Sequence, residues 1–269
     1  MKSPVAIGAV RKLFKDLQDS SRNAKPLAVG GASELAGVLA KELGRGGEAS
    51  AVRVGGPEGA AVYVHLAGGG DDEAVLTRAR RARVPIVAVA SGDEPLAYVL
   101  ETDVVRVKGG ERLPVEEIAE VIASRLDEAG APLAAKLPAL RGAVCERIVA
   151  SFARKNGVVG VAVFVPGADL PVLALNQVRM LLLLDQAYGL ELDPRRRLPE
   201  VLATVGAGFG LRSVARELLD LVPVAGWAVK GGVAYGGTRA LGKAAILRLE
   251  AGEGSASRSG RGPSRRPLT

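Results

Sequence analysis

The stretch "PLAVGGASELAGVLAKEL", residues 26–43, decides the fold of the first half of this chain. A short apolar run, Pro26 to Val29, ends in Gly30 and Gly31 and passes directly into a segment with helical spacing. A strand that ends in glycines in front of a helix is typical of the phosphate-binding turn of nucleotide-binding α/β proteins. The stretch therefore predicts a strand, a turn and a helix, and it raises the question of a phosphate site.

The segments that follow alternate between strand and helix. Runs such as "AAVYVHLAG" and "VPIVAVAS" are apolar on both faces, as are central strands of a parallel sheet covered by helices. We expect strands at 26–30, 51–54, 60–67, 84–90 and 103–107. Helices are expected at 33–44, 71–82 and 114–127, with a short helical turn at 94–100. This alternation predicts a doubly wound α/β domain, with a mainly parallel sheet, over residues 24–130.

After Gly130 the pattern changes to long stretches rich in Ala, Leu and Val at helical spacing. These stretches cover 139–155, 170–189, 198–220 and 222–248. They predict an all-α domain over residues 131–250, followed by a disordered basic tail, 251–269. An amphipathic helix is expected within residues 1–23, packed on this chain or on a partner; a helix on the membrane surface is the alternative.

Composition limits the kinds of function. Of the 269 residues, 48% are hydrophobic and 24% are charged, which suffices for a packed core. The chain has one cysteine and one histidine, so we expect no disulfide, no Cys/His zinc site, and no metal or other cofactor. The net charge of +7 comes from the two ends of the chain, and the neutral middle argues against a specific nucleic-acid partner.

The opening stretch lacks the chemistry of a working phosphate loop. Such a loop has the pattern G-x-x-x-x-G-K-[ST], because its lysine contacts phosphate oxygens and its hydroxyl binds Mg²⁺. Counting from Gly30 or from Gly31 places neither group at its position, and Lys41 lies too far along the helix to substitute. The amino end of the helix, with Ser33 as its predicted N-cap, retains only a weak attraction for an anion.

Two later motifs follow this turn in the order found in GTPases. Over residues 24–128 the chain resembles a translation-factor-class (Era-like) GTPase domain, a P-loop NTPase. The D-x-x-G motif of that family corresponds to "HLAG", residues 65–68, and its N-K-x-D motif to "ASGD", residues 90–93. The Mg²⁺-binding acid and the base-reading asparagine are absent. The resemblance implies a pseudo-GTPase without catalysis, with a vestigial nucleotide or anion site at Gly30, Gly31, Ser33, Gly68 and Asp93.

The second half carries a separate resemblance. Its segments "LNQVRML" and "PVAGWAVKGGVAYGGTRALG" are similar to a bacterial helical family of unknown function, and the likeness covers residues 143–248. That family occurs behind GTPase domains and in the YcjF-type membrane proteins. The resemblance implies no activity, but it implies that the helical domain accompanies a GTPase-like domain.

Polar side chains within the apolar helices are candidates for interaction. Buried charges are costly unless they are paired. These residues therefore form either solvated faces with an internal ion pair, or a polar seam against the sheet domain or a second copy. Trp227, the only tryptophan, is the best anchor candidate, because indoles are enriched in interface cores. The full set is Asn176, Gln177, Arg179, Arg212, Arg216, Trp227, Lys230 and Arg239.

Three single residues have simple structural interpretations. His65 is expected at a strand end without a ligand role, since the chain has no second imidazole. Asp93 precedes Pro95 and is expected in a turn. Cys145 lies among aliphatic residues and is expected to be buried and inert.

Together these features predict a cytoplasmic, non-catalytic scaffold or regulatory protein that associates with itself or with a protein partner. A GTPase is one candidate partner, and the inner face of the membrane is a candidate docking surface. Two alternatives stay open. In the first, the α/β domain binds a nucleotide or an anion without hydrolysis. In the second, the helices are embedded in the membrane as in YcjF-like proteins, although Asp169 and Lys230 interrupt the two longest low-charge runs.

Overall fold

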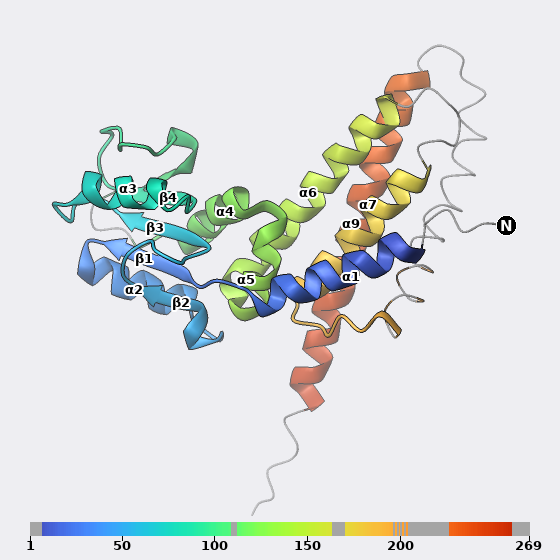
Figure 1. Cartoon of the computed structure of the whole chain (residues 1–269), viewed down its shortest axis with the longest axis horizontal. Coiled ribbons are helices and arrows are strands. Elements are labelled where there is room, and N and C mark those ends of the chain that lie inside the picture. The colour runs from blue at the N-terminus through green and yellow to red at the C-terminus, as the bar shows by residue number, and fades with distance from the viewer. Residues whose placement is uncertain are drawn as a thin grey trace, which may run out of the picture.

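The computed structural model describes residues 7–108, 112–162, 170–195, 197, 199, 201, 203 and 226–259. After helix α1 (Ile7–Arg22), the first half alternates between strands and helices (Figure 1). Its elements are β1 (Leu27–Gly31), α2 (Ser33–Leu43), β2 (Val52–Val54), β3 (Val62–Leu66), α3 (Asp72–Arg81), β4 (Ile86–Ala90), β5 (Val104–Arg106) and α4 (Val115–Leu126). The helices that follow are α5 (Ala131–Lys136), α6 (Pro138–Ala162), α7 (Leu170–Ala187) and α9 (Gly226–Ser259).

The five strands form one sheet in the order β2-β1-β3-β4-β5, and every neighbouring pair is parallel. The expected parallel α/β architecture is thereby confirmed. From β1 the chain moves to β2 on one side and then crosses to β3 on the other side. The point where this direction reverses lies between β1 and β3, and ligands of doubly wound proteins bind outside the carboxyl ends of the strands at such a point. We call this end of the sheet the carboxyl edge and the opposite end the amino edge.

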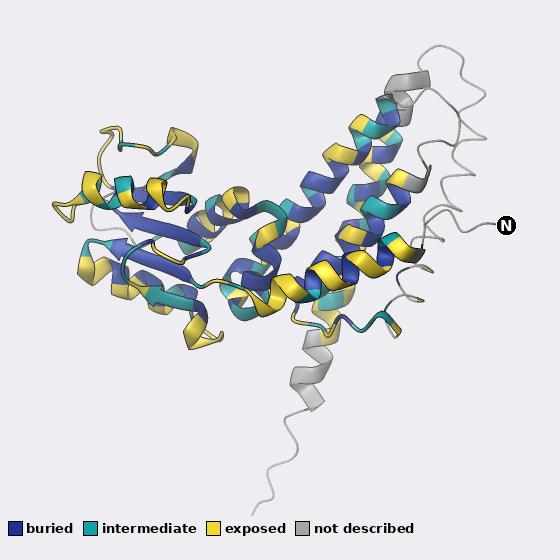
Figure 2. Cartoon of the chain, in the orientation of Figure 1, coloured by how far each residue is buried: buried dark blue, intermediate teal, exposed yellow. Residues whose placement is uncertain are grey.

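Helices cover both faces of the sheet, and the side chains alternate accordingly. Leu27 and Val29 of β1 point into a large core that also contains α2 and α4, whereas Ala28 points toward α3 on the other face. The three central strands, β1, β3 and β4, are buried almost throughout, whereas the edge strand β2 is not (Figure 2). The larger core continues from the sheet into α5, α6 and α7 through residues such as Leu133 and Phe152. The sheet and the helical region therefore share one set of packed side chains.

The amphipathic helix α1 packs within the chain. Val10, Phe14 and Leu17 are buried, and α1 lies against α7. The Gln186 side chain of α7 donates a hydrogen bond to the Leu17 carbonyl oxygen at 2.9 Å. The apolar face of α1 is thus occupied by the protein itself, as the first of its two interpretations predicts.

Two predictions of secondary structure are wrong. No helix forms at 94–100, because Tyr98 adopts a left-handed backbone conformation (φ 65°) that interrupts a right-handed helix; a short 3₁₀ turn lies at Glu101–Asp103 instead. The last helix also continues to Ser259, into the stretch that was expected to be disordered from residue 251. No proline precedes Pro263 in that stretch, so nothing in the sequence forces the helix to end earlier.

In the part of the chain that the structure describes, no helix combines the length and the apolar character that crossing a bilayer requires.

Candidate functional site

The candidate site at the carboxyl edge begins with a very short connection between β1 and α2. Only Ala32 lies between the last strand residue, Gly31, and the first helical residue, Ser33. The Ala32 N–H donates a hydrogen bond of 2.9 Å to the carbonyl oxygen of Leu66, the last residue of β3. The turn is therefore closed against the neighbouring strand.

Gly31 is required by this close approach. Its φ is +96°, and a Cβ atom at this position would lie 2.0 Å from the Leu66 carbonyl oxygen. The backbone of Gly69 also lies against Gly31 and Ala32, since a Cβ on Gly69 would meet their atoms at 3.2–3.4 Å. Backbone atoms thus fill the space between the carboxyl ends of β1 and β3.

Gly30 makes room for a tyrosine. A Cβ on Gly30 would lie 2.5 Å from the hydroxyl of Tyr63 and 2.7 Å from the carbonyl oxygen of Gly55. Tyr63 belongs to β3 and is buried, with 1% of its surface exposed. The two glycines of the opening stretch therefore have packing roles, one toward a side chain and one toward a backbone.

Tyr63 begins a chain of polar groups that contains the only histidine. The Tyr63 hydroxyl lies 3.3 Å from Nδ1 of His65, and Nε2 of His65 lies 3.0 Å from Oδ1 of Asp72. Asp72, in the first turn of α3, also accepts hydrogen bonds from the amides of Gly68 (2.8 Å) and Gly69 (3.2 Å). The carboxylate of Asp72 thereby fixes the loop between β3 and α3.

Burial and hydrogen bonding shift the pKa values along this chain. Burial lowers the pKa of His65, although the neighbouring Asp72 carboxylate opposes the shift. For Asp72, burial disfavours ionisation, but the Gly68 amide, the His65 ring and the Gly69 amide together lower its pKa. Burial raises the pKa of Tyr63 to about 12. At pH 7 the three linked side chains are therefore a neutral phenol, a largely neutral imidazole and an ionised carboxylate.

This arrangement organises a loop and offers no reactive group. His65 is fully buried, and both of its ring nitrogens have polar neighbours within the protein. A general base must reach the proton that it abstracts, which a buried and engaged imidazole does not. His65 lies one residue before the end of β3, close to the predicted strand end; sequence reasoning missed its partners Tyr63 and Asp72. The spacing of Tyr63 and His65 could have indicated that they share one face of a strand.

The remaining residues predicted for the nucleotide site are dispersed around this edge. Ser33 is exposed and is the first residue of α2; Ala32 occupies the N-cap position, so the prediction of a Ser33 cap is wrong. The reason is that the helix begins directly after the one-residue turn. Asp93 is exposed in the loop after β4, where the Arg106 guanidinium bonds to the Gly92 carbonyl oxygen and to Glu101.

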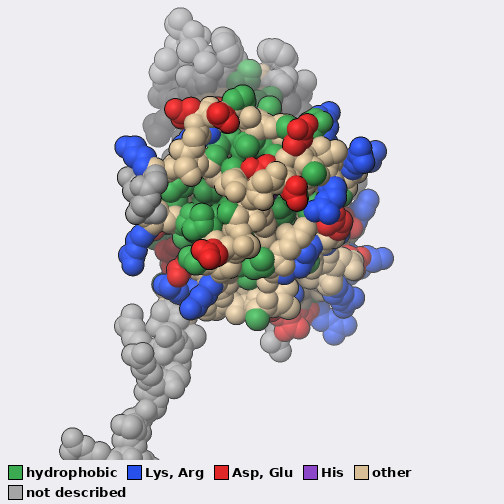
Figure 3. Space-filling model, turned by 90° about the vertical axis from the view of Figure 1, so that its left-hand side faces the viewer, with side chains coloured by type: hydrophobic (Ala, Val, Ile, Leu, Met, Phe, Trp, Pro, Cys, Tyr) green, Lys and Arg blue, Asp and Glu red, His purple; other side chains and the backbone are tan. Residues whose placement is uncertain are grey.

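The surface at the carboxyl edge contains apolar side chains. Figure 3, which views the molecule toward this edge, shows hydrophobic side chains gathered near the middle, with carboxylates among and around them. Leu35 of α2 is 48% exposed and Val54 at the end of β2 is 55% exposed. Leu35 therefore does not fill the turn beneath it.

The helical region contains a polar cluster that the sequence predicted in part. The amide of Asn176 in α7 donates to Asn156 Oδ1 at 2.8 Å, and the Asn156 amide donates to the Thr238 hydroxyl at 2.9 Å. Asn156 and Thr238 are fully buried, and Gln177 is buried nearby on α7. Hydrogen bonds among side chains of α6, α7 and α9 thus fix how these three helices pack.

Arg179 lies at the junction between the helices and the sheet region. Its guanidinium is 2.7 Å from Glu128, and the ammonium group of Lys155 is 2.5 Å from the same carboxylate. Glu128 follows α4 in a 3₁₀ turn, Asp127–Gly130. The contact agrees with both interpretations of the polar residues, since it is an internal ion pair and a seam toward the sheet region.

The structure says little about the other predicted interaction residues. Arg212 and Arg216 lie outside the described residues, as do the side chains of Trp227 and Lys230, although the backbone of these last two is in α9. Arg239 is half-buried on α9.

Small residues bring α6 and α9 close together. A Cβ on Gly242 would lie 2.5 Å from a methyl group of Val149, and a Cβ on Gly231 would lie 2.4 Å from Val161. The helices therefore use glycine for close packing, as the frequent glycines of this segment suggest.

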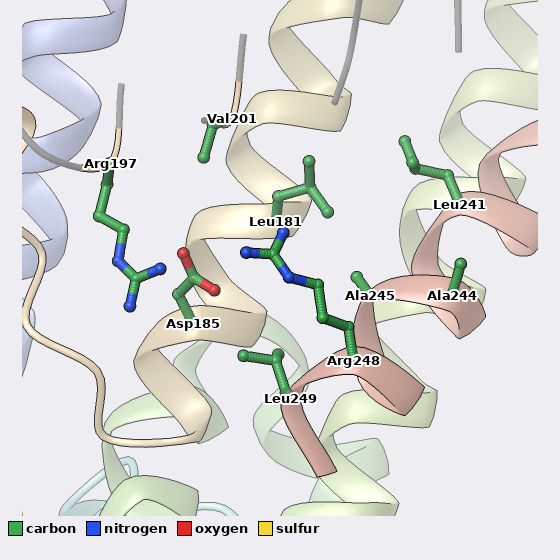
Figure 4. Close-up of a pocket in the computed structure, with 9 residues that line it drawn as sticks. All are labelled: Leu181, Asp185, Arg197, Val201, Leu241, Ala244, Ala245, Arg248 and Leu249. Atoms are coloured by element: carbon green, nitrogen blue, oxygen red, sulfur yellow. The ribbon is translucent and has the colours of Figure 1, made fainter. Parts of the chain in front are cut away.

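A second concave feature lies between α7, α9 and the segment containing Arg197 and Val201 (Figure 4). It has a volume of about 170 Å³ and is lined mainly by leucine and alanine. The Asp185 carboxylate lies between the guanidinium groups of Arg197 and Arg248. Burial raises the pKa of Asp185, and the two arginines oppose this shift. Sequence reasoning missed this cluster, because its members are up to 63 positions apart (Asp185 to Arg248).

The geometry defines a parallel α/β protein with a helical extension, whose carboxyl edge is filled by its own backbone and side chains. Comparisons with models of known protein families, with curated proteins and with solved structures give no match.

Proposed function

We propose that this chain is a non-catalytic interaction protein, built from a GTPase-like α/β domain of the P-loop type that binds no nucleotide and from an all-α domain. The observation that carries the proposal is the one-residue connection between β1 and α2, whose amide bonds to Leu66. Such a domain would bind a protein partner, and a GTPase is one candidate.

The short turn lacks the parts of a phosphate cradle. A phosphate loop surrounds its ligand with several consecutive backbone N–H groups and adds a lysine. Here the Ala32 amide is used internally, Gly69 packs against the turn, and Lys41 lies in the last turn of α2. The positioning and charge stabilisation that phosphoryl transfer needs are therefore not assembled at this turn.

The loop after β4, which corresponds to the base-reading motif of GTPases, also argues against nucleotide binding. The carbonyl oxygens of Gly92 and Glu94 accept hydrogen bonds from Arg106, whose guanidinium is also paired with Glu101 at 2.8 Å. The loop after β4 is thus tied to the edge strand β5. Asp93 alone is a weak reader for guanine, because the asparagine and lysine that accompany it in GTPases are replaced by alanine and serine.

The two alternatives have less support. An anion at the amino end of α2 would meet Glu34, which already places a negative charge in the first turn. A membrane-embedded protein would need a spanning helix, and none is found among the described residues.

Calorimetric titration with GTP, GDP and ATP in the presence of Mg²⁺ tests the proposal. We expect dissociation constants weaker than about 1 mM and no release of phosphate. Micromolar affinity with turnover would overturn the proposal. Micromolar affinity without turnover would establish the alternative of binding without hydrolysis.

A matched variant locates any binding that appears. Ser33→Glu adds a carboxylate at an exposed position in the first turn of α2, where it is compatible with the helix dipole. It should abolish anion binding at this helix end and leave the fold intact. Lys41→Ala is the control, since Lys41 lies at the opposite end of α2 and should have no effect.

A further inference from the structure

A hollow lies at the amino edge of the sheet, on the side opposite the candidate site. It has a volume of about 330 Å³ and is bordered by the end of α3, the start of β4 and the loop before β5. The side chains that matter here are Arg80, Arg83, Tyr98, Leu100, Asp103 and Arg125. The hollow shares the loop between β4 and β5 with the region discussed above, but none of these six residues takes part in the contacts on which the proposed function rests.

Backbone strain is concentrated in this hollow. The described residues contain three non-glycine residues with positive φ, and two of them, Arg83 (54°) and Tyr98 (65°), line it. The third, Asp127, is at the junction with the helices. Residues held in left-handed conformations cost stability and cluster at functional sites.

Arg83 occupies a position where glycine is the usual residue. Its N–H bonds to the Arg80 carbonyl oxygen at 3.0 Å, and the N–H of Val84 bonds to the Ala79 carbonyl oxygen at 3.0 Å. This pair of bonds is the Schellman motif that ends a helix, and Arg83 is its left-handed residue. The chain has 35 glycines, yet it keeps a long cationic side chain here.

Tyr98 and Leu100 are exposed despite their apolar surfaces. Tyr98 is 49% exposed and Leu100 is 64% exposed. The Arg80 guanidinium lies 4.7 Å from the centre of the Tyr98 ring. Packing within the protein therefore does not explain why a strained backbone position carries an aromatic ring. Tyr and Arg are the residue types enriched at the energetic centres of protein interfaces.

The hollow is cationic. Three arginines line it against one acid, Asp103, which is 3.4 Å from Arg125. Arg83 has no ion-pair partner among the described residues. An adjoining hollow of about 310 Å³ shares Arg83 and Val84, contains Lys25, and is lined by no acidic residue. The two hollows adjoin, and together they are lined by four cationic side chains and one acid; we call them the groove.

We propose that this groove, formed by the two hollows, binds an acidic segment of a partner protein in which apolar side chains alternate with carboxylates. Carboxylates would pair with Arg80 and Arg83, and apolar side chains would pack on Tyr98 and Leu100. The proposal rests on the proposed function in one respect, since it supplies the interaction surface of a non-catalytic protein. A single tyrosine is no stacking platform for nucleic acid, and a concave groove does not fit the flat surface of a membrane.

Fluorescence anisotropy with a labelled eight-residue peptide of alternating Glu and Leu tests the proposal on the full chain. We expect a dissociation constant of about 10–500 μM at low salt, which weakens as salt screens the charges. A peptide of alternating Lys and Leu should not bind. The absence of binding by the acidic peptide would overturn the proposal. Stronger competition by an oligouridylate or by phosphatidylglycerol vesicles would also overturn it, in favour of those ligands.

The decisive variant is Arg83→Gly, because glycine fits the left-handed position better than arginine does. It should raise the melting temperature by about 2–4 °C and weaken peptide binding about fivefold or more. Arg45→Ala removes the same charge from the exposed end of α2 and should not change binding. Unchanged binding in Arg83→Gly would contradict the proposal. Nucleotide binding at the carboxyl edge would overturn the proposed function alone, since the two tests use opposite edges of the sheet.

Discussion

The two edges of the sheet differ in backbone strain and in how far their groups are paired within the protein. At the carboxyl edge, where proteins of this architecture usually bind ligands, Ala32 bonds to Leu66 and Asp72 closes the next loop. Glycine stands there at positions of positive φ, such as Gly31 and Gly68. The carboxyl edge is therefore built at low conformational cost and is internally satisfied.

The amino edge has the reverse character. Arg83 and Tyr98 occupy left-handed positions without glycine, and their side chains remain exposed. Selection for folding alone favours an unstrained backbone whose polar groups are all hydrogen-bonded. A strained backbone that carries exposed side chains is not explained by folding and needs another reason. The difference shows that the usual ligand edge of an α/β sheet is held here by internal contacts, and it supports our proposal that the opposite edge is the recognition surface.

The largest effect that would test this comparison is expected at Gly31. Gly31→Ala would place a Cβ 2.0 Å from the Leu66 carbonyl oxygen at a φ of +96°, and should lower the free energy of unfolding by about 3 kcal/mol or more. Urea denaturation measures this. Gly37→Ala is the matched control: Gly37 lies within α2 with nothing within 4 Å of its Cβ position, so alanine should stabilise it. Equal effects of the two variants would contradict the view that the turn is closed by backbone packing.

The helical region offers a second, smaller test of close packing. Gly242→Ala would place a Cβ 2.5 Å from Val149, which is fully buried, and should cost about 1–3 kcal/mol. Val149→Ala should cost a similar amount by leaving a cavity. Combined, the two substitutions should cost at least about 1 kcal/mol less than the sum of the single effects, because each compensates the volume change of the other. Strict additivity of the denaturation energies would show that α6 and α9 do not pack through this pair.

The sequence predicted most of the parallel sheet, because strands such as "VYVHL" and "IVAVA" are apolar on both faces and are separated by helical segments. The sequence also predicted a glycine-containing turn after the first strand, but it did not reveal why glycine is required there. A vestigial phosphate turn and a packing turn both need glycine, and only the approach of Leu66 and Tyr63 separates the two. Periodicity also failed at 94–100, where Tyr98 carries a backbone conformation that its residue type does not indicate.

Clusters formed by distant residues were beyond sequence reasoning. Asp185 meets Arg248 across two helices, and Arg80 meets Tyr98 across a strand and a loop. Asn176 and Arg179 could be predicted as polar contacts, because they interrupt apolar helices. Their partners Asn156 and Glu128 depend on how the helices cross, which no local pattern records.

The polar chain at the carboxyl edge predicts a moderate dependence of stability on pH. Because burial lowers the pKa of His65, the unfolded chain takes up a proton near pH 6.5 that the folded protein refuses. The stability present at pH 7 should therefore fall as the pH drops below 6.5, with a slope of at most about 1.4 kcal/mol per pH unit. The lowered pKa of Asp72 acts in the same direction only at more acidic pH.

Denaturation of His65→Gln between pH 7.5 and pH 5 isolates this effect, since His65 is the only histidine. The variant should be less stable than the native chain at pH 7.5 and should show a flatter pH dependence. An unchanged slope would mean that the imidazole is not protected by the fold, and the carboxyl edge would then be more open than Tyr63 and Asp72 indicate.

The smallest expected effect is at the amino edge and concerns Tyr98. Tyr98→Asn removes the contact with Arg80, worth about 0.5–1 kcal/mol at an exposed site, and gains a similar amount because asparagine tolerates the left-handed conformation. The free energy of unfolding should thus change by less than about 0.5 kcal/mol, as measured by urea denaturation. Tyr98→Gly should be equally mild. A loss above about 2 kcal/mol in both variants would assign Tyr98 to the packing of the loop, and the contrast between a structural edge and a recognition edge would lose its clearest residue. A near-zero change would show that folding does not require the tyrosine at this strained position, as the proposed recognition role of the amino edge expects.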